Sequence, residues 1–260
     1  MAITAVPRWA ERDPRIAAAI HAAAARIRPL ARPYASESDD DLLAVLAEPA
    51  RAADWRPVLR ELRRRPPDLR LLNLVDAILA ADGAAGTQIA PLLGLTLARL
   101  GTDAVPAARV WAATPDHPLL WTAFRLLAAH GDDSDAPAVV AGLDWLDNRP
   151  EDLCGYDELI GALARIGGST ATAAVPRLRR LWYSPHSYER PAYLQALVAL
   201  DPTGAERFLV EGLWDCETKV RLLAAQRAPL TDMTRERLHY LRDDPIENAD
   251  VRAATSARLG

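Results

Sequence analysis

Five helical stretches of this chain end in the same way, and the endings recur at nearly regular intervals. The endings are Leu100-Gly101, His130-Gly131, Ile166-Gly167, Leu200-Asp201 and Leu259-Gly260. The first four are 30, 36 and 34 residues apart, and the last follows after 59 residues, with an intervening ending near Ala228-Pro229. A period of roughly 30–36 residues is typical of helical hairpins that stack into a repeat protein.

A second helix is predicted after each ending, because the residues that follow are those that start helices. Pro106, Pro137 and Pro176 each come after a short run of Ser, Thr, Asp or Gly. Ser, Thr and Asp cap helix N-termini, Pro is tolerated in the first helical turn, and Gly suits a left-handed residue after a helix. The predicted unit is therefore a helix, a tight turn and a second helix.

The composition predicts an all-α fold. Half of the 260 residues are hydrophobic, with only two Phe among them, and the dominant Ala and Leu are strong helix formers. No apolar run approaches the roughly 18–20 residues that a membrane-spanning helix needs. Residues 1–13 lack the apolar core of a signal peptide. We therefore expect a cytoplasmic protein that does not enter a membrane.

Two later segments resemble HEAT repeats of the HEAT-like, PBS-lyase type. They run from Trp214-Asp215 through Val220-Arg221 to Ala224-Ala225, and from Asp243-Asp244-Pro245 through Asp250-Val251-Arg252 to Leu259-Gly260. The resemblance implies a right-handed α-solenoid of helical hairpins over residues 84–260. It also implies that the Asp caps the helix, that Val and the Ala pair face the core, and that the Arg bonds toward the neighbouring repeat. Because scaffolds, transport factors, lyases and DNA glycosylases share this fold, it does not define an activity.

Residues 1–83 fit the period poorly, and we expect them to form a divergent N-terminal helical cap. Asp13-Pro14 is a good helix start, and an apolar stripe follows at Ile16, Ile20, Ala23, Ile27 and Leu30. Further helices are predicted over residues 38–51, 55–65 and 68–81, with Ser38 or Asp39 as the cap of the first. Terminal repeats must present a polar outer face, which explains a divergent sequence. The predicted organisation is a cap over 1–83 and one continuous array over 84–260.

Four tryptophans fall near the ends of successive second helices. They are Trp111, Trp145, Trp182 and Trp214, and Tyr240 lies in the comparable region of the next unit. Since second helices line the concave face of HEAT solenoids, the resemblance implies an aromatic ladder that faces a ligand. Trp is the residue most enriched at binding hot spots. Rings that fill gaps between Ala-rich helices would explain the same pattern, so both interpretations stay open.

The segment from Trp182 to Pro191 joins two helices and is rich in functional residue types. Tyr183, His186 and Tyr188 lie within it, and loops carry function disproportionately often. His186 could act as a general base if Glu189 or another carboxylate oriented it. A Ser-Pro turn between tyrosines is also a common way to seat a helix. We expect Tyr183, His186 and Tyr188 to be binding contacts rather than catalytic groups.

A basic cluster suggests nucleic-acid binding as an alternative. Its members are Arg60, Arg63, Arg64, Arg65 and Arg70. Arginines can hold phosphates through bidentate contacts. However, Arg60 and Arg64 share a helix face near Glu61 and Asp68, which favours a solvated helix end. The net charge of −4, from 31 basic and 35 acidic residues, also disfavours a nucleic-acid surface.

No catalytic motif or metal site is complete in the sequence. Cys154 and Cys216 are too few for a disulfide framework or a cysteine zinc site, and the five histidines never show metal-ligand spacing. No glycine-rich phosphate loop occurs, because the glycines lie at helix ends. We therefore predict no catalytic residue, metal or cofactor.

The leading functional hypothesis is a non-enzymatic scaffold that binds another protein or a peptide on the concave face of the solenoid. One alternative is a HEAT-like DNA glycosylase or other nucleic-acid enzyme. Another is a lyase-type or pathway enzyme for small molecules, which would need a closed aromatic pocket near Trp182 and His186. We also expect an apolar edge on the C-terminal helix, which could support a homodimer.

Overall fold

Helices make up all the regular secondary structure of residues 15–19, 22, 32–85, 88–149 and 154–260, which the computed structural model describes. The all-α prediction is confirmed for these residues. The helices are α2 (Asp39–Leu46), α3 (Ala52–Leu62), α4 (Val75–Ala85), α5 (Ala90–Leu97), α6 (Val105–Ala113), α7 (Leu120–His130), α8 (Ala136–Asp147), α9 (Tyr156–Ile166), α10 (Gly168–Ala173), α11 (Val175–Leu181), α12 (Arg190–Leu200), α13 (Pro202–Gly212), α14 (Thr218–Arg227), α15 (Asp232–Asp243) and α16 (Ala249–Leu259). Short 3-10 helices precede several of them, the longest being Leu69–Leu74 and Ala98–Ala104.

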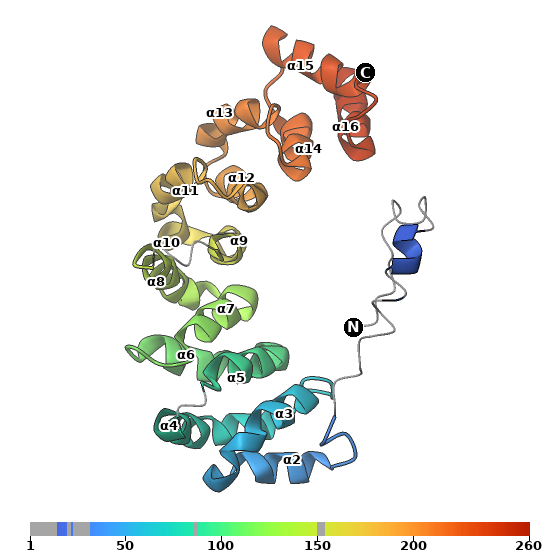
Figure 1. Cartoon of the computed structure of the whole chain (residues 1–260). Helices are drawn as coiled ribbons and strands as arrows, with labels where there is room; N and C mark the ends of the chain where they lie inside the picture. The colour runs from blue at the N-terminus through green and yellow to red at the C-terminus, as the bar shows by residue number, and fades with distance from the viewer. Residues whose placement is uncertain (1–14, 20–21, 23–31, 86–87, 150–153) are drawn as a thin grey trace.

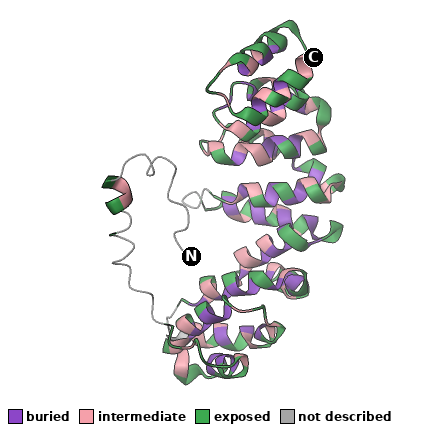
Figure 2. Ribbon diagram, turned by 90° about the vertical axis from the view of Figure 1, so that its right-hand side faces the viewer, coloured by how far each residue is buried: buried purple, intermediate pink, exposed green. Residues whose placement is uncertain are grey.

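The helices follow one another along a curved stack of two rows (Figure 1). We call α3, α5, α7, α9, α12, α14 and α16 the inner helices, because they lie along the inner side of the curve. The outer helices are α4, α6, α8, α10, α11, α13 and α15. Inner helices such as α9 and α12, or α14 and α16, pack on each other more extensively than successive outer helices do. Buried residues recur along the whole stack of helices (Figure 2), and those of both rows belong to one continuous core cluster.

The turns between inner and outer helices contain the residues that the sequence predicts there. Prolines occupy the first turns of α6, α8 and α11. Gly101 and Gly167 have φ angles of 61° and 72°, a left-handed conformation that glycine adopts without strain. Gly131 differs, because its φ is −69°. A Cβ at Gly131 would lie 2.5 Å from the carbonyl oxygen of Leu127, so close packing rather than backbone conformation requires glycine here.

The helix α14 places its residues as the resemblance to HEAT repeats implies. Val220, Ala224 and Ala225 are fully buried. Arg221 donates to both carboxylate oxygens of Glu247, at 2.7 Å each, in the turn before α16. The Arg therefore bonds toward the next unit, and the bond joins α14 to the turn that positions α16.

Asp215 departs from the role that the resemblance implies. The N-cap residue of α14 is Glu217, and it makes no side-chain capping bond. Asp215 instead accepts the backbone N–H of Glu217 at 2.8 Å and pairs with Arg190 at 2.6 Å. It thus orders the turn before α14 and connects it to the start of α12.

Three arginines at or just after the end of an inner helix bond the end of the preceding inner helix. They share the sequence Ala-Arg-Leu-Gly or Ala-Arg-Ile-Gly, at Ala98-Arg99-Leu100-Gly101 in the 3-10 helix after α5, Ala164-Arg165-Ile166-Gly167 at the end of α9, and Ala257-Arg258-Leu259-Gly260 at the end of α16. Arg165 donates to the carbonyl oxygens of Ala128 and Gly131 at 3.0 and 2.9 Å, at the end of α7. We call such an arginine a clamp, because helix C-termini leave carbonyls unsatisfied and favour a nearby cation.

The other two clamps make equivalent bonds. Arg99 donates to backbone carbonyls just after α3, including that of Arg65 at 2.8 Å. Arg258 bonds the end of α14, with the carbonyl of Ala228 at 2.8 Å. The recurring glycine of each ending was predicted from the sequence and the arginine was not, although the alanine and arginine before it recur in all three endings.

The N-terminal region contains the helices predicted beyond residue 38. Ser38 and Asp41 form a capping box at the start of α2, which ends at Leu46 rather than at residue 51. The helix α3 overlaps the prediction over residues 55–65, whereas residues 68–81 divide into a 3-10 helix over Leu69–Leu74 and the first part of α4. The boundary predicted after residue 83 falls within α4, and α3 packs directly on α5. Most of the helix predicted from Asp13 to Leu30 lies outside the described residues. None of the helices in the described part of the chain is long and apolar enough to cross a membrane.

The C-terminal helix α16 does not present the apolar edge that we expected. Val251 and Thr255 are buried against α14 and α15. The fully exposed positions of α16 are small or polar, namely Ala249, Asp250, Ala253, Ser256 and Ala257. The two larger apolar side chains of this helix pack on the core, since Val251 is fully buried and Leu259 is half-buried there. The exposed apolar residue nearby is Ile246, in the preceding turn.

Candidate interaction surface

The tryptophan row lies on the outer helices. Trp111 and Trp145 belong to α6 and α8, Trp182 follows α11, and Trp214 follows α13. Figure 1 shows these helices along the outer side of the curve, so the row does not belong to the inner helices.

Two of the four tryptophans are core residues. Trp111 and Trp182 are each 5% exposed. Trp111 stacks on His117, with 5.9 Å between ring centres. Trp182 packs edge-on against Phe208 at 5.6 Å, and its Nε1 donates to Glu211 at 3.0 Å. For these two, the gap-filling interpretation holds, because neither ring is accessible to a partner.

Trp145 is half-buried in a stack that the sequence did not reveal. Trp121, at the start of α7, lies parallel to it with 5.4 Å between ring centres, and Arg149 covers its ring at 3.9 Å. A Cβ at Gly155 would lie 2.7 Å from the Trp121 ring. The repeat period did not single out Trp121, because this residue lies in a first helix, outside the row of second-helix tryptophans.

The loop between α11 and α12 does not assemble a catalytic pair. Glu189 is 1% exposed and accepts bonds from the Gly155 N–H at 3.0 Å and the Tyr193 hydroxyl at 2.5 Å. His186 packs instead against the edge of Tyr188, and its buried Nε2 has no hydrogen-bond partner in the structure. Glu189 is therefore a structural carboxylate that joins α9 to α12, and it does not orient His186 as a base.

Tyr188 and Tyr193 hold their hydroxyl protons more tightly than a free tyrosine does. Burial, together with the bond to Glu189, raises the pKa of Tyr193 above its ordinary value. Tyr188 donates to the Cys154 thiol at 3.2 Å, and this bond, with some desolvation, raises the pKa of Tyr188 to about 12. Tyr183 and Tyr188 are 65% and 54% exposed, so they remain available as contacts.

A second accessible group of aromatic side chains lies near the C-terminal end of the outer row. Trp214 and Tyr240 are 50% and 59% exposed. The guanidinium carbon of Arg237 lies 5.4 Å from the Trp214 ring centre and 4.7 Å from that of Tyr240. Arg237 Nε also donates to the Leu213 carbonyl at 3.1 Å. We call these three side chains the Trp214–Arg237–Tyr240 cluster.

This cluster borders an open hollow of about 500 Å³ between α14, α15 and the turn before α16. Arg237, Tyr240, Asp244 and Ile246 contribute to its lining. Ile246 is 92% exposed. A polar hollow with exposed aromatic and aliphatic groups at its border is suited to a peptide segment of mixed character.

A second depression lies between α5 and α7. It measures about 340 Å³, and Leu95, Pro118 and Trp121 are among its lining residues. Neither this groove nor the hollow beside α15 includes Trp182 or His186. The small-molecule alternative therefore gains no support from either depression.

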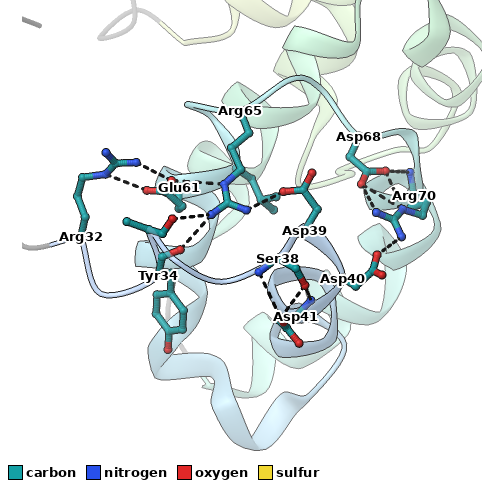
Figure 3. Close-up of polar contacts among 12 residues, drawn as sticks. Arg32, Tyr34, Ser38, Asp39, Asp40, Asp41, Glu61, Arg65, Asp68 and Arg70 are labelled. Carbon is teal, nitrogen blue, oxygen red and sulfur yellow. Dashed lines mark hydrogen bonds and ion pairs between the residues drawn. The ribbon is translucent and has the colours of Figure 1, made fainter.

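The basic cluster is largely neutralised by carboxylates (Figure 3). Arg65 pairs with Asp39 at 2.7 Å and with Glu61 at 3.4 Å, and Arg70 pairs with Asp68 at 2.7 Å. Arg64 lies 3.6 Å from Glu61, which is buried and also accepts bonds from Arg32. Arg60 and Arg63 are exposed. These ion pairs fit the helix-end interpretation better than a phosphate-binding site.

No three His, Cys, Asp or Glu side chains in the described ranges are grouped closely enough to hold a metal ion. No family model matches this chain, and neither a curated protein nor a solved structure matches it. Family and function must therefore be inferred from the residues and geometry of the chain itself.

Proposed function

We propose that this chain is a HEAT-type right-handed α-solenoid that acts in the cytoplasm as a non-enzymatic scaffold for a protein or peptide partner. The recurring helix endings, the two rows of helices and the three arginine clamps support the repeat architecture. In such an array each hairpin contacts mainly its neighbours and offers extended surface rather than one deep pocket.

The observation that carries the proposal is the Trp214–Arg237–Tyr240 cluster. Trp, Tyr and Arg are the residue types most enriched at binding hot spots. Here two half-exposed rings flank one guanidinium beside an open hollow. The cluster lies at the ends of outer helices, so we propose this surface as the binding site in place of the concave face.

A pull-down of the tagged full chain from its native lysate, with and without nuclease, tests the proposal. We expect a stoichiometric protein partner that survives nuclease and is lost when Trp214→Ala and Tyr240→Ala are combined. The matched control combines Leu69→Ala and Met233→Ala, which truncate side chains that are 50% and 53% exposed. Both variants should keep the melting temperature of the wild type within about 4 °C, since surface substitutions cost little.

Two outcomes would overturn the proposal. If the variant that combines Trp214→Ala and Tyr240→Ala still captures the partner, the partner does not bind at this cluster. Loss of all capture after nuclease treatment would instead indicate a nucleic-acid protein.

A further inference from the structure

We propose that the Trp214–Arg237–Tyr240 cluster docks an acidic segment of a partner protein, with the carboxylate of a glutamate or aspartate side chain on the guanidinium of Arg237. This inference rests on the proposed scaffold function and names the chemistry that its binding site selects. It goes beyond that function because a purely apolar partner would also satisfy the scaffold proposal.

The guanidinium of Arg237 is held in place while its terminal nitrogens stay available. Both flanking rings lie within cation–π distance of its carbon, and its Nε donates to the Leu213 carbonyl. Among the described residues, no carboxylate lies within ion-pair distance of Arg237. An arginine fixed in this way presents the two-pronged geometry that matches a carboxylate, and it loses little side-chain freedom on binding.

Three other charged groups of the lining, Arg221, Glu247 and Asp215, are already paired within the chain. Glu247 is paired with Arg221 at 2.7 Å, and this pairing lowers the pKa of Glu247, so the carboxylate stays ionised. Asp215 is paired with Arg190 at 2.6 Å, and its side chain is only 3% exposed. The described lining of the hollow contains two arginines. Arg221 is paired with Glu247, so Arg237 is the one that can form an ion pair with an acidic residue of a partner.

The surroundings of Arg237 favour an acidic residue that has apolar neighbours. Ile246 is almost fully exposed at the hollow, and the two rings offer apolar faces. A carboxylate that binds Arg237 would bring its flanking residues onto these groups. Burial of apolar surface around a charge pair excludes water and strengthens the pair.

The charge distribution favours an acidic peptide over a nucleic acid. Asp244 lines the hollow, with its carboxylate bonded only to the Ile246 N–H among the contacts in the described chain. The whole chain carries a net charge of −4. A phosphate backbone would place successive negative charges along this acidic border, whereas one carboxylate needs only Arg237.

Proton–nitrogen NMR of the full chain provides the test, with the indole N–H signal of Trp214 assigned by its loss in Trp214→Phe. The probes are the peptides acetyl-Leu-Glu-Leu-amide and acetyl-Leu-Gln-Leu-amide, which differ only in charge. We expect the glutamate peptide to shift the Trp214 signal with at least tenfold higher affinity than the glutamine peptide. In Arg237→Gln this preference should disappear.

Arg235→Gln is the matched control, because it removes the same charge from an exposed position on the same helix. It should keep the tenfold preference. Equal binding of the two peptides to the wild type, or an equal loss in Arg235→Gln and Arg237→Gln, would overturn the proposal. So would a single-stranded oligonucleotide that shifts the Trp214 signal at lower concentration than the glutamate peptide. Self-association that shifts this signal in the absence of peptide would also overturn it, in favour of a second copy.

The two proposals can fail separately. If a captured protein partner is lost with Trp214→Ala and Tyr240→Ala but retained with Arg237→Gln, the scaffold function stands and the acidic-segment inference fails. If the double variant also retains the partner, the proposed binding site itself is wrong.

Discussion

The junction between α7 and α9 differs from the junction between α9 and α12 in what joins the helices. Arg165, near the end of α9, donates to two carbonyls at the end of α7. Ala199 takes the corresponding place in α12, two residues before Asp201, which follows the helix. There the helices are joined by the buried side chains of Glu189 and Tyr193.

The contrast shows two physical solutions for the same task. A clamp supplies charged N–H donors to carbonyls that a helix end leaves free. A buried carboxylate is stable only when every hydrogen bond to it is made and its surroundings pack closely. The α9/α12 junction should therefore be sensitive to lost volume, and the α7/α9 junction to a lost guanidinium.

Truncation of Tyr193 should have the largest effect. Tyr193→Ala removes a fully buried ring and should cost about 3–5 kcal/mol of unfolding free energy, as other large-to-small core substitutions do. Tyr193→Phe keeps the ring and removes only the donor to Glu189, so it should cost about 1–3 kcal/mol. Urea denaturation followed by circular dichroism measures both. Equal costs would mean that the hydroxyl, and not the packing, holds this junction.

Removal of a clamp should have an intermediate effect. Arg165→Met keeps the aliphatic stem and removes the donors, so we expect a loss of about 1–2 kcal/mol and faster amide exchange near the end of α7. Arg227→Met is the control, because this exposed arginine lies one residue from the clamp position in α14. The clamp interpretation fails if the two variants lose the same stability.

A new clamp should have a smaller, stabilising effect. Ala129 is exposed and lies two residues before Gly131, as each clamp arginine lies two residues before Gly101, Gly167 or Gly260. Ala129→Arg should bond the end of α5 and raise the unfolding free energy by about 0.3–1 kcal/mol. Thermal melts should show an increase for Ala129→Arg and none for Ala129→Met. An increase of the same size in both variants would mean that the added stability comes from helix propensity and not from a new clamp.

The dependence of stability on pH should distinguish the ion pairs from the clamps. We expect this to be the smallest of the four effects. Arg109 lowers the pKa of Asp135 below its usual value, so this pair stabilises the fold above the unfolded pKa near 3.8. That stability is lost as the pH falls through the lower folded pKa. Melts from pH 6 to pH 3 should show a weaker acid dependence in Asp135→Asn than in wild type. Arg165→Met should keep the full dependence, because its carbonyl acceptors do not titrate.

Local sequence was enough to predict the helical class of the described residues and many of the turns between their helices. Ser38 caps α2, and Pro106, Pro137 and Pro176 begin outer helices as expected. The period also placed the turn glycines, although Gly131 is required for close packing rather than for its backbone angle. These features depend on backbone conformation and on hydrogen bonds between residues that are close in the sequence. Helix caps and turns can therefore be predicted from a short stretch of sequence.

The candidate site could be predicted only in part. Trp214 and Tyr240 belonged to the row that the sequence indicated, but so did Trp111 and Trp182, which are buried. Arg237 was not identified at all. Its role depends on contacts with Trp214 and the Leu213 carbonyl, 23 and 24 positions earlier in the chain. The helix and repeat patterns of the sequence do not predict contacts between particular side chains that are so far apart in the chain.

The sequence by itself determined an all-helical chain of recurring hairpins, because capping and propensity act locally and repeat with the period. Tertiary structure alone decided which row of helices lies outside the curve and which tryptophans reach the surface. A shift of one residue turns a side chain by about 100° around its helix, so exposure depends on how neighbouring helices pack. For the same reason Trp182 is covered by Phe208 of α13, whereas Trp214, after the next outer helix, stays open beside Arg237.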